Sequence, residues 1–112
     1  MKYIVAIVKP HRLDEIRAAL TGVGVEGLTV SEVKGFGRQK GHSEVYRGTE
    51  YQVEFVSKLK LEIAVEDDKA ASVVDAVRLS AKTDRIGDGK IFVLDLQDAV
   101  RIRTGETGAT AL

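Results

Sequence analysis

Hydrophobic and polar positions divide the first third of the chain into a strand, a helix and a second strand. Residues 2–8 are β-branched and almost continuously apolar, which predicts a strand buried on both faces. Pro10 ends this strand, and apolar side chains then recur at helical spacing until the glycines at 22 and 24. The helical stripe consists of Leu13, Ile16, Leu20 and Val23. A second strand is predicted over 28–36.

The second half of the chain repeats this order. Residues 58–66 alternate between charged or small side chains and large apolar ones, which is the pattern of a half-buried strand. A helix is predicted through about Lys82, with Asp67 or Asp68 as its N-terminal cap. The apolar face of this helix consists of Val73, Val74, Val77 and Ala81. Residues 91–96 form the fourth predicted strand.

The resulting order, β-α-β followed by β-α-β, is typical of the ferredoxin-like (split βαβ) fold, an α+β architecture. Its two helices would cover one face of a four-stranded antiparallel sheet and leave the other face uncovered. An uncovered apolar sheet face usually binds a partner, so self-association is expected. With 112 residues, the chain is expected to form a single domain over 1–112.

A long segment at 37–55 separates the two halves. It holds three glycines and little apolar periodicity until its last few residues. Structureless connections longer than about 12–15 residues are uncommon in compact domains and are usually functional. We therefore expect a flexible functional loop, with a two-stranded β-ribbon or a plain surface loop as the alternatives.

Composition narrows the classes of protein and of partner. The chain has 17 Lys and Arg against 17 Asp and Glu, so it lacks the surplus of cations that nonspecific nucleic-acid binding needs. The Lys-Gly-Phe-Gly at 34–37 begins like an RNA-recognition motif. The motif then requires aromatic residues where this chain has Arg38 and Gly41, so RNA binding is only a minor alternative. No cysteine is present for disulfides or thiolate metal sites. Without a membrane-length apolar run or a signal peptide, an intracellular, soluble protein is expected.

Two segments in the last quarter of the chain are candidates for binding an anion. The Gly-Asp-Gly-Lys at 87–90 allows close backbone approach to a phosphate, although it is also ordinary turn chemistry. Arg101 and Arg103 alternate with apolar residues, which predicts an extended segment with both guanidinium groups on one side. Such a pair needs a neutralising partner, either a bound anion or carboxylates of the same chain. With Lys58 and Lys90, the pair favours a polyphosphate site formed after folding or across a subunit boundary.

Glycines also bracket a basic segment, Arg38-Gln39-Lys40, whose backbone amides are suited to a carboxylate or a phosphate. Gln39 offers an amide oxygen that Mg²⁺ accepts, a weak signal by itself. Neither His11 nor His42 has a partner at metal-ligand spacing. No acidic pair or nucleophile motif marks a catalytic site.

These segments belong to a longer resemblance. Over essentially its full length the sequence resembles the PII nitrogen-regulatory signal-transduction family (GlnB/GlnK-like). The matching segments lie at 27–30, 33–41, 44–48, 50–51, 83–93 and 101–106. The resemblance implies a homotrimer of ferredoxin-like subunits with three clefts between neighbours, each binding ATP or ADP. Asp84 stands where the family commonly has glycine, and Asp tolerates a left-handed backbone better than most residues.

The resemblance also assigns the expected site residue by residue. The nucleotide would contact Gly27, Leu28, Thr29, Gly35, Gly37, Arg38, Gln39, Glu62, Ala64, Gly87, Asp88, Gly89 and Lys90, with Arg101 and Arg103 from the adjacent subunit. The family binds 2-oxoglutarate beside MgATP, and here that effector would contact Gln39, Lys40, Gly41 and Lys58. Gln39 would ligate Mg²⁺. A dianion and a triphosphate share a site only if the metal and several cations offset their repulsion.

The segment at 37–55 is the expected output of this sensor. In similar proteins Tyr51 is uridylylated or adenylylated by a nucleotidylyltransferase, and Arg47, beside Tyr46 at the loop tip, contacts partners. The implied partners are an ammonium transporter and a glutamine synthetase adenylyltransferase or sensor kinase. The protein would then be cytoplasmic and reach the membrane only through a channel partner.

A non-enzymatic, ligand-sensing regulator is the main functional hypothesis, with at most slow ATP hydrolysis. The alternative is a small ferredoxin-like enzyme that acts on phosphate esters or nucleotides. In such an enzyme the arginines would stabilise a transition state rather than a bound ligand.

Overall fold

The computed structural model describes residues 1–36, 45–46, 50–51 and 55–112. The main elements are β1 (Lys2–Val8), α1 (Leu13–Gly22), β2 (Thr29–Gly35), β5 (Val56–Val65), α2 (Asp67–Ala81) and β6 (Lys90–Asp95). Two short 3-10 turns, η1 (Pro10–Arg12) and η2 (Gly108–Ala111), precede α1 and follow β6. The bounds predicted from the sequence agree with these to within about two residues, the usual uncertainty of an element's end.

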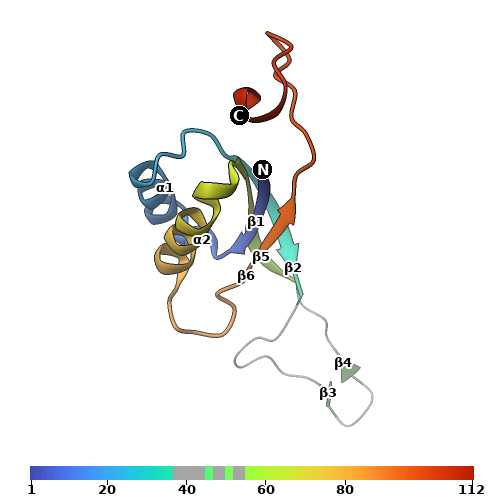
Figure 1. Ribbon diagram of the computed structural model, residues 1–112. Coiled ribbons are helices and arrows are strands. Elements are labelled where there is room, and N and C mark those ends of the chain that lie inside the picture. Colours follow the sequence, from blue (N-terminus) through green and yellow to red (C-terminus); the bar gives the residue numbers. More distant parts are fainter. Residues whose placement is uncertain (37–44, 47–49, 52–54) are drawn as a thin grey trace.

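Four of the strands form one sheet in the order β2-β5-β1-β6, and all neighbouring strands in it are antiparallel. Both helices lie against the same face of this sheet (Figure 1). The ferredoxin-like arrangement predicted from the repeated β-α-β pattern is therefore confirmed. Strands β5 and β1 occupy the centre of the sheet, so the residues they carry are brought next to both edge strands.

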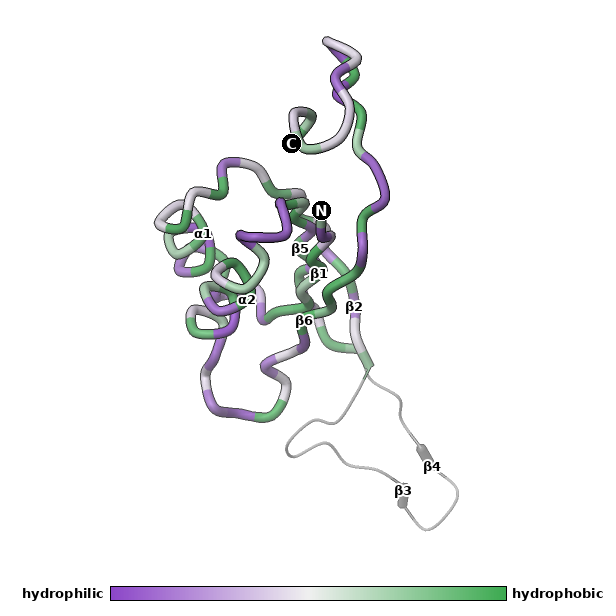
Figure 2. The backbone as a smooth tube through the Cα atoms, viewed as in Figure 1, coloured by the Kyte–Doolittle hydropathy of each residue, from purple (hydrophilic) through white to green (hydrophobic). Residues whose placement is uncertain are grey.

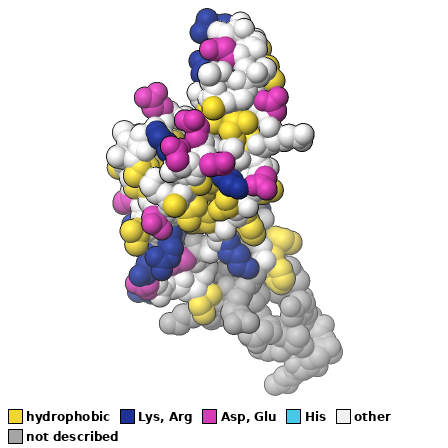
Figure 3. Space-filling view, viewed as in Figure 1, with side chains coloured by type: hydrophobic (Ala, Val, Ile, Leu, Met, Phe, Trp, Pro, Cys, Tyr) yellow, Lys and Arg dark blue, Asp and Glu magenta, His cyan; other side chains and the backbone are white. Residues whose placement is uncertain are grey.

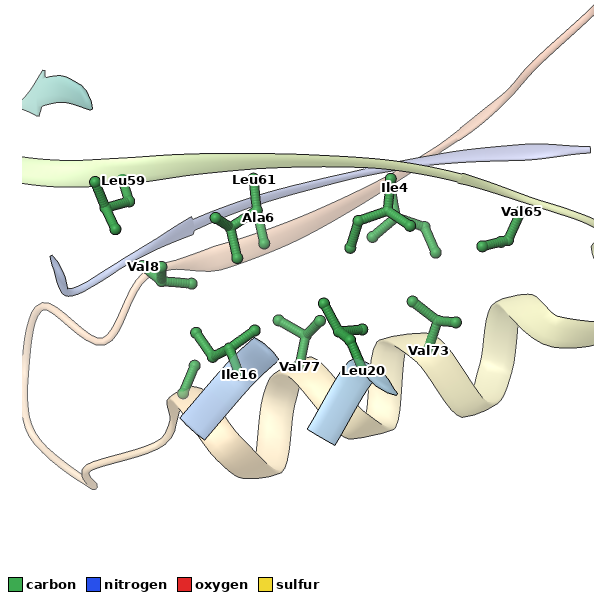
Figure 4. Packing of buried hydrophobic residues seen from close by; sticks show 12 residues of the cluster. Ile4, Ala6, Val8, Ile16, Leu20, Leu59, Leu61, Val65, Val73 and Val77 are labelled. Atoms are coloured by element: carbon green, nitrogen blue, oxygen red, sulfur yellow. The ribbon is translucent and has the colours of Figure 1, made fainter. Parts of the chain in front are cut away.

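One apolar core fills the space between the sheet and the helices (Figure 4). Alternate residues of the central strands meet residues at helical spacing from α1 and α2. The largest fully buried side chains are Ile4, Val8, Ile16, Leu20, Leu61, Ile63, Val73 and Val77. Figure 2 shows the same division, with hydrophobic stretches along the strands and alternating hydrophobic and hydrophilic positions along both helices. Each buried aliphatic side chain stabilises the fold by about 1.5–3 kcal/mol relative to its exposed state.

The first strand is buried on one face only. Ile4 and Ala6 are fully buried against the helices, whereas Tyr3, Val5 and Ile7 on the other face are half-buried. The prediction of a strand buried on both faces is therefore wrong for the single chain. The continuous apolar run arises because β1 is central in the sheet, while both helices cover the same side. The uncovered face expected from the fold is present.

Helix α2 begins without the predicted side-chain cap. Its N-cap residue is Glu66, which makes no side-chain hydrogen bond to the first turn. Asp67 instead pairs with the N-terminal ammonium group of Met1 at 2.9 Å. Both Asp67 and Asp68 lie in the first turn. Their charges therefore still favour the helix N-terminus, although neither residue caps it.

Two short strands lie within the 37–55 segment. β3 (Val45–Tyr46) and β4 (Glu50–Tyr51) pair antiparallel, with Val45 opposite Tyr51 and Tyr46 opposite Glu50. This ladder corresponds to the ribbon considered as an alternative. The functional role of the segment stays a prediction. The rings of Phe36 and Phe55 pack with their centroids 5.8 Å apart, so an aromatic contact joins the last residue of the segment to the residue that precedes it.

Candidate functional site

A turn connects α2 to β6, and hydrogen bonds to the Asp88 carboxylate hold it together. One oxygen of Asp88 accepts hydrogen bonds from the backbone N–H groups of Thr83 at 2.8 Å and Asp84 at 2.9 Å. The other oxygen accepts from the Thr83 hydroxyl and pairs with Lys9 Nζ at 3.1 Å. Because these donors engage the side chain, Asp88 is oriented toward the inside of the turn. A ligand contact from Asp88 would therefore come from its backbone.

These hydrogen bonds also set the ionisation of Asp88. Partial burial opposes the charged form, but the hydrogen bonds from Thr83 and the charge of Lys9 outweigh it and hold the pKa of Asp88 well below its ordinary value of 3.8. A lowered pKa means that the charged carboxylate stabilises the folded state. This stabilisation is present above pH 3.8 and is lost as the pH falls through the folded-state pKa.

We expect Asp88→Asn to lower the free energy of unfolding at pH 7 by about 2 kcal/mol, because charge-assisted hydrogen bonds are replaced by a neutral amide. The difference from the unmodified protein should shrink as the pH falls below 3.8. Urea unfolding at a series of pH values measures it. Asp75→Asn, at an exposed position of α2, is the matched control and should change little. A loss for Asp88→Asn that stays constant down to low pH would contradict this role.

Two backbone features fix the path of the same turn. Asp84 has φ +64°, in the left-handed region, as expected for an Asp that replaces a common glycine. Gly89 has φ +103°, and a Cβ atom there would lie 1.7 Å from the backbone oxygen of Ile7. Only glycine fits this close approach between the turn and β1. The turn is therefore pinned against the end of the first strand.

Lys58 is the one buried charged side chain among the residues that the structure describes, with 7% of its surface exposed. Its ammonium group donates a hydrogen bond to the carbonyl of Gly87. Burial and the nearby charge of Lys9 lower the pKa of Lys58, while Asp88 acts in the opposite direction. A partly desolvated ammonium close to a second lysine, whose own carboxylate partner is Asp88, attracts an additional anion.

A cavity of about 520 Å³, here called the turn cavity, gathers part of the residues expected to bind phosphate and, of those expected to bind the effector, Lys58. Its lining includes Gly35, Lys58, Gly87, Asp88, Gly89 and Lys90, all of them predicted. It also includes Ile7, Phe36, Arg85, Ile86 and Phe92, which were not. Because Lys58 lies on β5 and Gly87 in the turn after α2, only the folded chain brings them together. The combination of glycine backbone and ammonium groups is suited to an oxyanion.

A second cavity of about 670 Å³, here called the sheet-end cavity, gathers the other expected group. Its lining includes Gly27, Leu28, Thr29, Glu62 and Ala64. The segment after β6 also reaches it through Ala109, Ala111 and Leu112. Tyr3, a further lining residue, was missed because its position inside an apolar run reads as an ordinary strand residue. Its polar hydroxyl is the signal that could have marked it.

Comparison with known proteins shows the family to which the chain belongs. The family model described as "Nitrogen regulatory protein P-II" matches residues 1–106. This chain belongs to the PII family. It is 62% identical to the nitrogen regulatory protein P-II of Rhizobium etli and 54% identical to the nitrogen regulatory protein GlnK of Escherichia coli K12, in each case over 112 residues and 100% of both chains. A crystal structure of Arabidopsis thaliana PII bound to citrate superposes with a TM-score of 0.82 at 40% identity, covering 99% of this chain and 91% of that one.

The arginine pair of this PII chain lies in a tight hairpin rather than in an extended segment. Val100 pairs with Thr107, and between them the Arg101 N–H donates to the Glu106 carbonyl at 2.8 Å and the Gly105 N–H to the Arg101 carbonyl at 2.7 Å. The predicted extended geometry is therefore wrong. Gly105, with φ +75°, permits the reversal, and the glycine in the Thr-Gly-Glu-Thr segment at 104–107 was the available signal.

The Arg101 guanidinium has partners inside the chain. It lies 3.8 Å from the Glu106 carboxylate and donates to the Leu112 backbone oxygen at 3.1 Å. An intramolecular carboxylate was one of the two neutralising partners considered for this residue. Since Arg101 and Glu106 are both about two-fifths to half exposed, the pair contributes little to stability. Its guanidinium therefore remains accessible to a stronger anion.

The remaining predicted residues lie outside the part of PII that the structure describes. Gly37, Arg38, Gln39, Lys40, Gly41 and Arg47 belong to this group. Tyr46 and Tyr51 are placed only as members of β3 and β4. Their assigned roles stay predictions.

Two further observations concern metals and membranes. The residues that the structure describes contain no group of three His, Cys, Asp or Glu side chains arranged to hold a metal ion. In that same part of the chain, no helix combines the length and apolar character needed to span a bilayer. Among the described residues on the face seen in Figure 3, charged side chains of both signs are mixed.

Proposed function

We propose that this PII protein is a sensor of nitrogen, carbon and energy status that binds ATP or ADP, together with Mg²⁺ and 2-oxoglutarate, and regulates partner proteins through its 37–55 segment. In this proposal the chain is a regulator and not an enzyme. The family name describes a regulatory protein, and the ligands are those expected from the resemblance.

The convergence of the predicted residues in two cavities along β5 is the observation that carries this proposal. Lys58 lines the turn cavity, and Glu62 lines the sheet-end cavity. These residues are four positions apart on one strand, so their side chains share a face and lie about 13 Å apart along it. One extended nucleotide spans such a distance, with its phosphates at the glycine turn and its nucleoside at the far end of the strand.

The charge distribution supports this orientation. Lys58 and Lys90 line the turn cavity, and the backbone at 87–89 contributes amide groups, which together suit the phosphates. In the sheet-end cavity, apolar side chains such as Leu28 lie near the Glu62 carboxylate, an acceptor of hydrogen bonds. An uncharged, partly apolar nucleoside is compatible with that lining, whereas a triphosphate is not.

For the effector, we propose that Lys58 pairs with a carboxylate of 2-oxoglutarate. The Arabidopsis PII structure holds citrate, which indicates that a protein of this fold accepts a small polycarboxylate. Gln39 would supply an amide oxygen to Mg²⁺, with Lys40 and Gly41 at the remaining carboxylate oxygens. ADP lacks the γ-phosphate that helps to hold the metal, so it should support 2-oxoglutarate binding poorly.

A homotrimer completes the proposed site. The side chain of Ile102, at the tip of the hairpin, is 99% exposed, and that of Val100 is 61% exposed. Figure 1 shows this hairpin extending away from the sheet and helices. Apolar side chains so exposed on an extended arm favour burial against another subunit. Arg101 and Arg103 would then reach the phosphates bound by that neighbour.

We expect the double variant Arg101→Ala and Arg103→Ala to weaken ATP binding by about 100-fold, because two charge-assisted contacts to phosphate are removed. Isothermal titration calorimetry measures the change. Arg17→Ala, which removes an exposed positive charge from α1, is the control for a general electrostatic effect. If the double variant binds ATP as tightly as the unmodified protein does, the arginine pair has a structural role and does not contact the phosphates.

Regulation would follow from differential binding. Ordering the base of the 37–55 segment around 2-oxoglutarate changes which conformations the segment adopts, and the coupling is reciprocal. We propose an ammonium transporter and a glutamine synthetase adenylyltransferase or sensor kinase as partners. Arg47 and Tyr46 would contact these partners. Tyr51 would accept a nucleotidyl group from a nucleotidylyltransferase. The protein would act in the cytoplasm.

Titration of the purified protein with ATP and with ADP, combined with an assay for released phosphate, tests the proposal. We expect the two nucleotides to compete for one class of site and the ATP to remain intact over the titration. If neither ATP nor ADP binds, the proposal that the protein is a sensor is overturned. Fast turnover of bound ATP would instead support the alternative of a small phosphate-ester enzyme.

A further inference from the structure

A hydrogen bond between two neighbouring strands lies inside the sheet-end cavity. The Tyr3 hydroxyl of β1 donates to Oε2 of Glu62 on β5 at 2.6 Å. In the register of these strands Tyr3 is opposite Ala64 and Val5 is opposite Glu62, so Tyr3 and Glu62 form a diagonal pair on the same face. Aromatic side chains reach such diagonal neighbours. The contact is therefore a built-in feature of the sheet register.

The other neighbour of Glu62 is also a cavity residue. Thr29, the first residue of β2, lies directly opposite Glu62 across the β2–β5 ladder. The carboxylate is thus flanked by Tyr3 on one side and Thr29 on the other. Among the described residues, Glu62 forms no ion pair with a lysine or arginine. In the part of the chain that the structure describes, the group that orients the Glu62 carboxylate in the cavity is therefore a neutral donor, the Tyr3 hydroxyl.

The chemistry of the pair is asymmetric. A carboxylate has two oxygens and only accepts hydrogen bonds, while the tyrosine hydroxyl occupies one of these oxygens. The hydrogen bond to Glu62, followed by burial, raises the pKa of Tyr3, which keeps the hydroxyl protonated as a donor at physiological pH. Among the described residues, no hydrogen bond to Oε1 of Glu62 is formed, so this oxygen can accept one from a donor in the cavity. Holding the carboxylate in advance also reduces the side-chain entropy lost when a ligand binds.

We infer that Tyr3 is a positioning residue for nucleoside recognition, which orients the Glu62 carboxylate to accept a hydrogen bond from a donor on the nucleoside part of the bound nucleotide. This inference rests on the proposed nucleotide binding and adds a selectivity device to it. An adenine nucleotide offers such donors at the exocyclic amino group of the base and at the ribose hydroxyls. Both are neutral donors that a fixed carboxylate oxygen selects.

The test compares ATP with three analogues that each lack one donor group: purine riboside triphosphate, with hydrogen in place of the exocyclic amine, and 2′-deoxy-ATP and 3′-deoxy-ATP, each without one ribose hydroxyl. Calorimetry with the full chain is expected to show that at least one analogue binds about 10-fold more weakly than ATP. In Tyr3→Phe, which removes only the hydroxyl, ATP itself should weaken about 3- to 10-fold. The penalty for that analogue should fall at least about 3-fold. The analogue affected identifies the donor.

Two further variants control the experiment. Glu62→Ala should abolish the same analogue penalty, and Tyr3→Phe should add little in its background because both changes remove one interaction. Thr21→Val removes a hydroxyl that bonds the Arg17 carbonyl on α1, away from the cavity, and should change no penalty.

The possible failures are distinguishable. If the unmodified protein binds no ATP, the proposed nucleotide binding itself fails. If ATP binds and the penalties of all three analogues are the same in the unmodified protein, Tyr3→Phe and Glu62→Ala, nucleotide binding stands and the role of Tyr3 is overturned. Should Tyr3→Phe not fold, Glu62→Ala decides, because unchanged penalties in that variant also overturn the inference.

Discussion

Gly89→Ala is expected to lower the free energy of unfolding by about 3 kcal/mol or more. Two effects add at this position. The backbone has φ +103°, which a residue with a Cβ atom rarely adopts, and the added Cβ would lie 1.7 Å from the Ile7 backbone oxygen. Neither atom belongs to a flexible side chain, so the turn has to move away from β1. Urea unfolding followed by circular dichroism, at one protein concentration, measures the loss.

Gly105→Ala is the matched control for this experiment. Gly105 also has a positive φ, +75°, but a Cβ atom added there would meet no described atom within 4 Å. Strain without a clash should cost about 1 kcal/mol. Equal losses for the two variants would contradict the claim that the close approach of Gly89 to Ile7 fixes the turn. Because Gly89 lines the turn cavity, its variant should also lose affinity for anions.

Lys58→Met is expected to weaken 2-oxoglutarate binding in the presence of MgATP by about 100-fold or more, while the fold stays intact. Truncating one member of a buried charge pair between protein and ligand costs about 2–5 kcal/mol of binding free energy. Stability should change little, because burial already disfavours the charged ammonium in the free protein. Equilibrium dialysis with labelled 2-oxoglutarate measures the affinity, and thermal unfolding measures the stability.

Lys60→Met is the natural comparison for Lys58→Met. Lys60 lies two residues further along the same face of β5 and carries the same charge, but it does not line the turn cavity. It should keep 2-oxoglutarate affinity within about 3-fold of the original, since only a distant, screened charge is lost. A loss of similar size in both variants would show that general charge, and not the position of Lys58, attracts the effector.

Much of the fold was predictable because periodicity in the sequence reports burial directly. The strict alternation of β5 and the helical stripes of α1 and α2 correspond to one core between a sheet and two helices. Burial of Lys58 was not predictable in the same way. Alternation assigns Lys58 to the polar side of β5, and the turn at 87–89 that covers it comes from a distant part of the chain.

The candidate site was predictable as a set of residue types but not as a geometry. The glycine turn and the basic residues are visible in the sequence, whereas the pairing of Asp88 with Lys9 depends on how the α2–β6 turn lies against the end of β1. Likewise, the hydrogen bond from Tyr3 to Glu62 depends on strand register. A one-residue shift of that register would direct Tyr3 to the other face.

Binding of 2-oxoglutarate in the presence and absence of MgATP tests the central claim most directly. Calorimetric titration of the effector should show saturable binding when MgATP is present, weak binding with ADP and none without nucleotide. By linkage, 2-oxoglutarate should raise the affinity for MgATP by the same factor. Binding of 2-oxoglutarate that is equally strong without nucleotide, or absent with MgATP, would contradict the account.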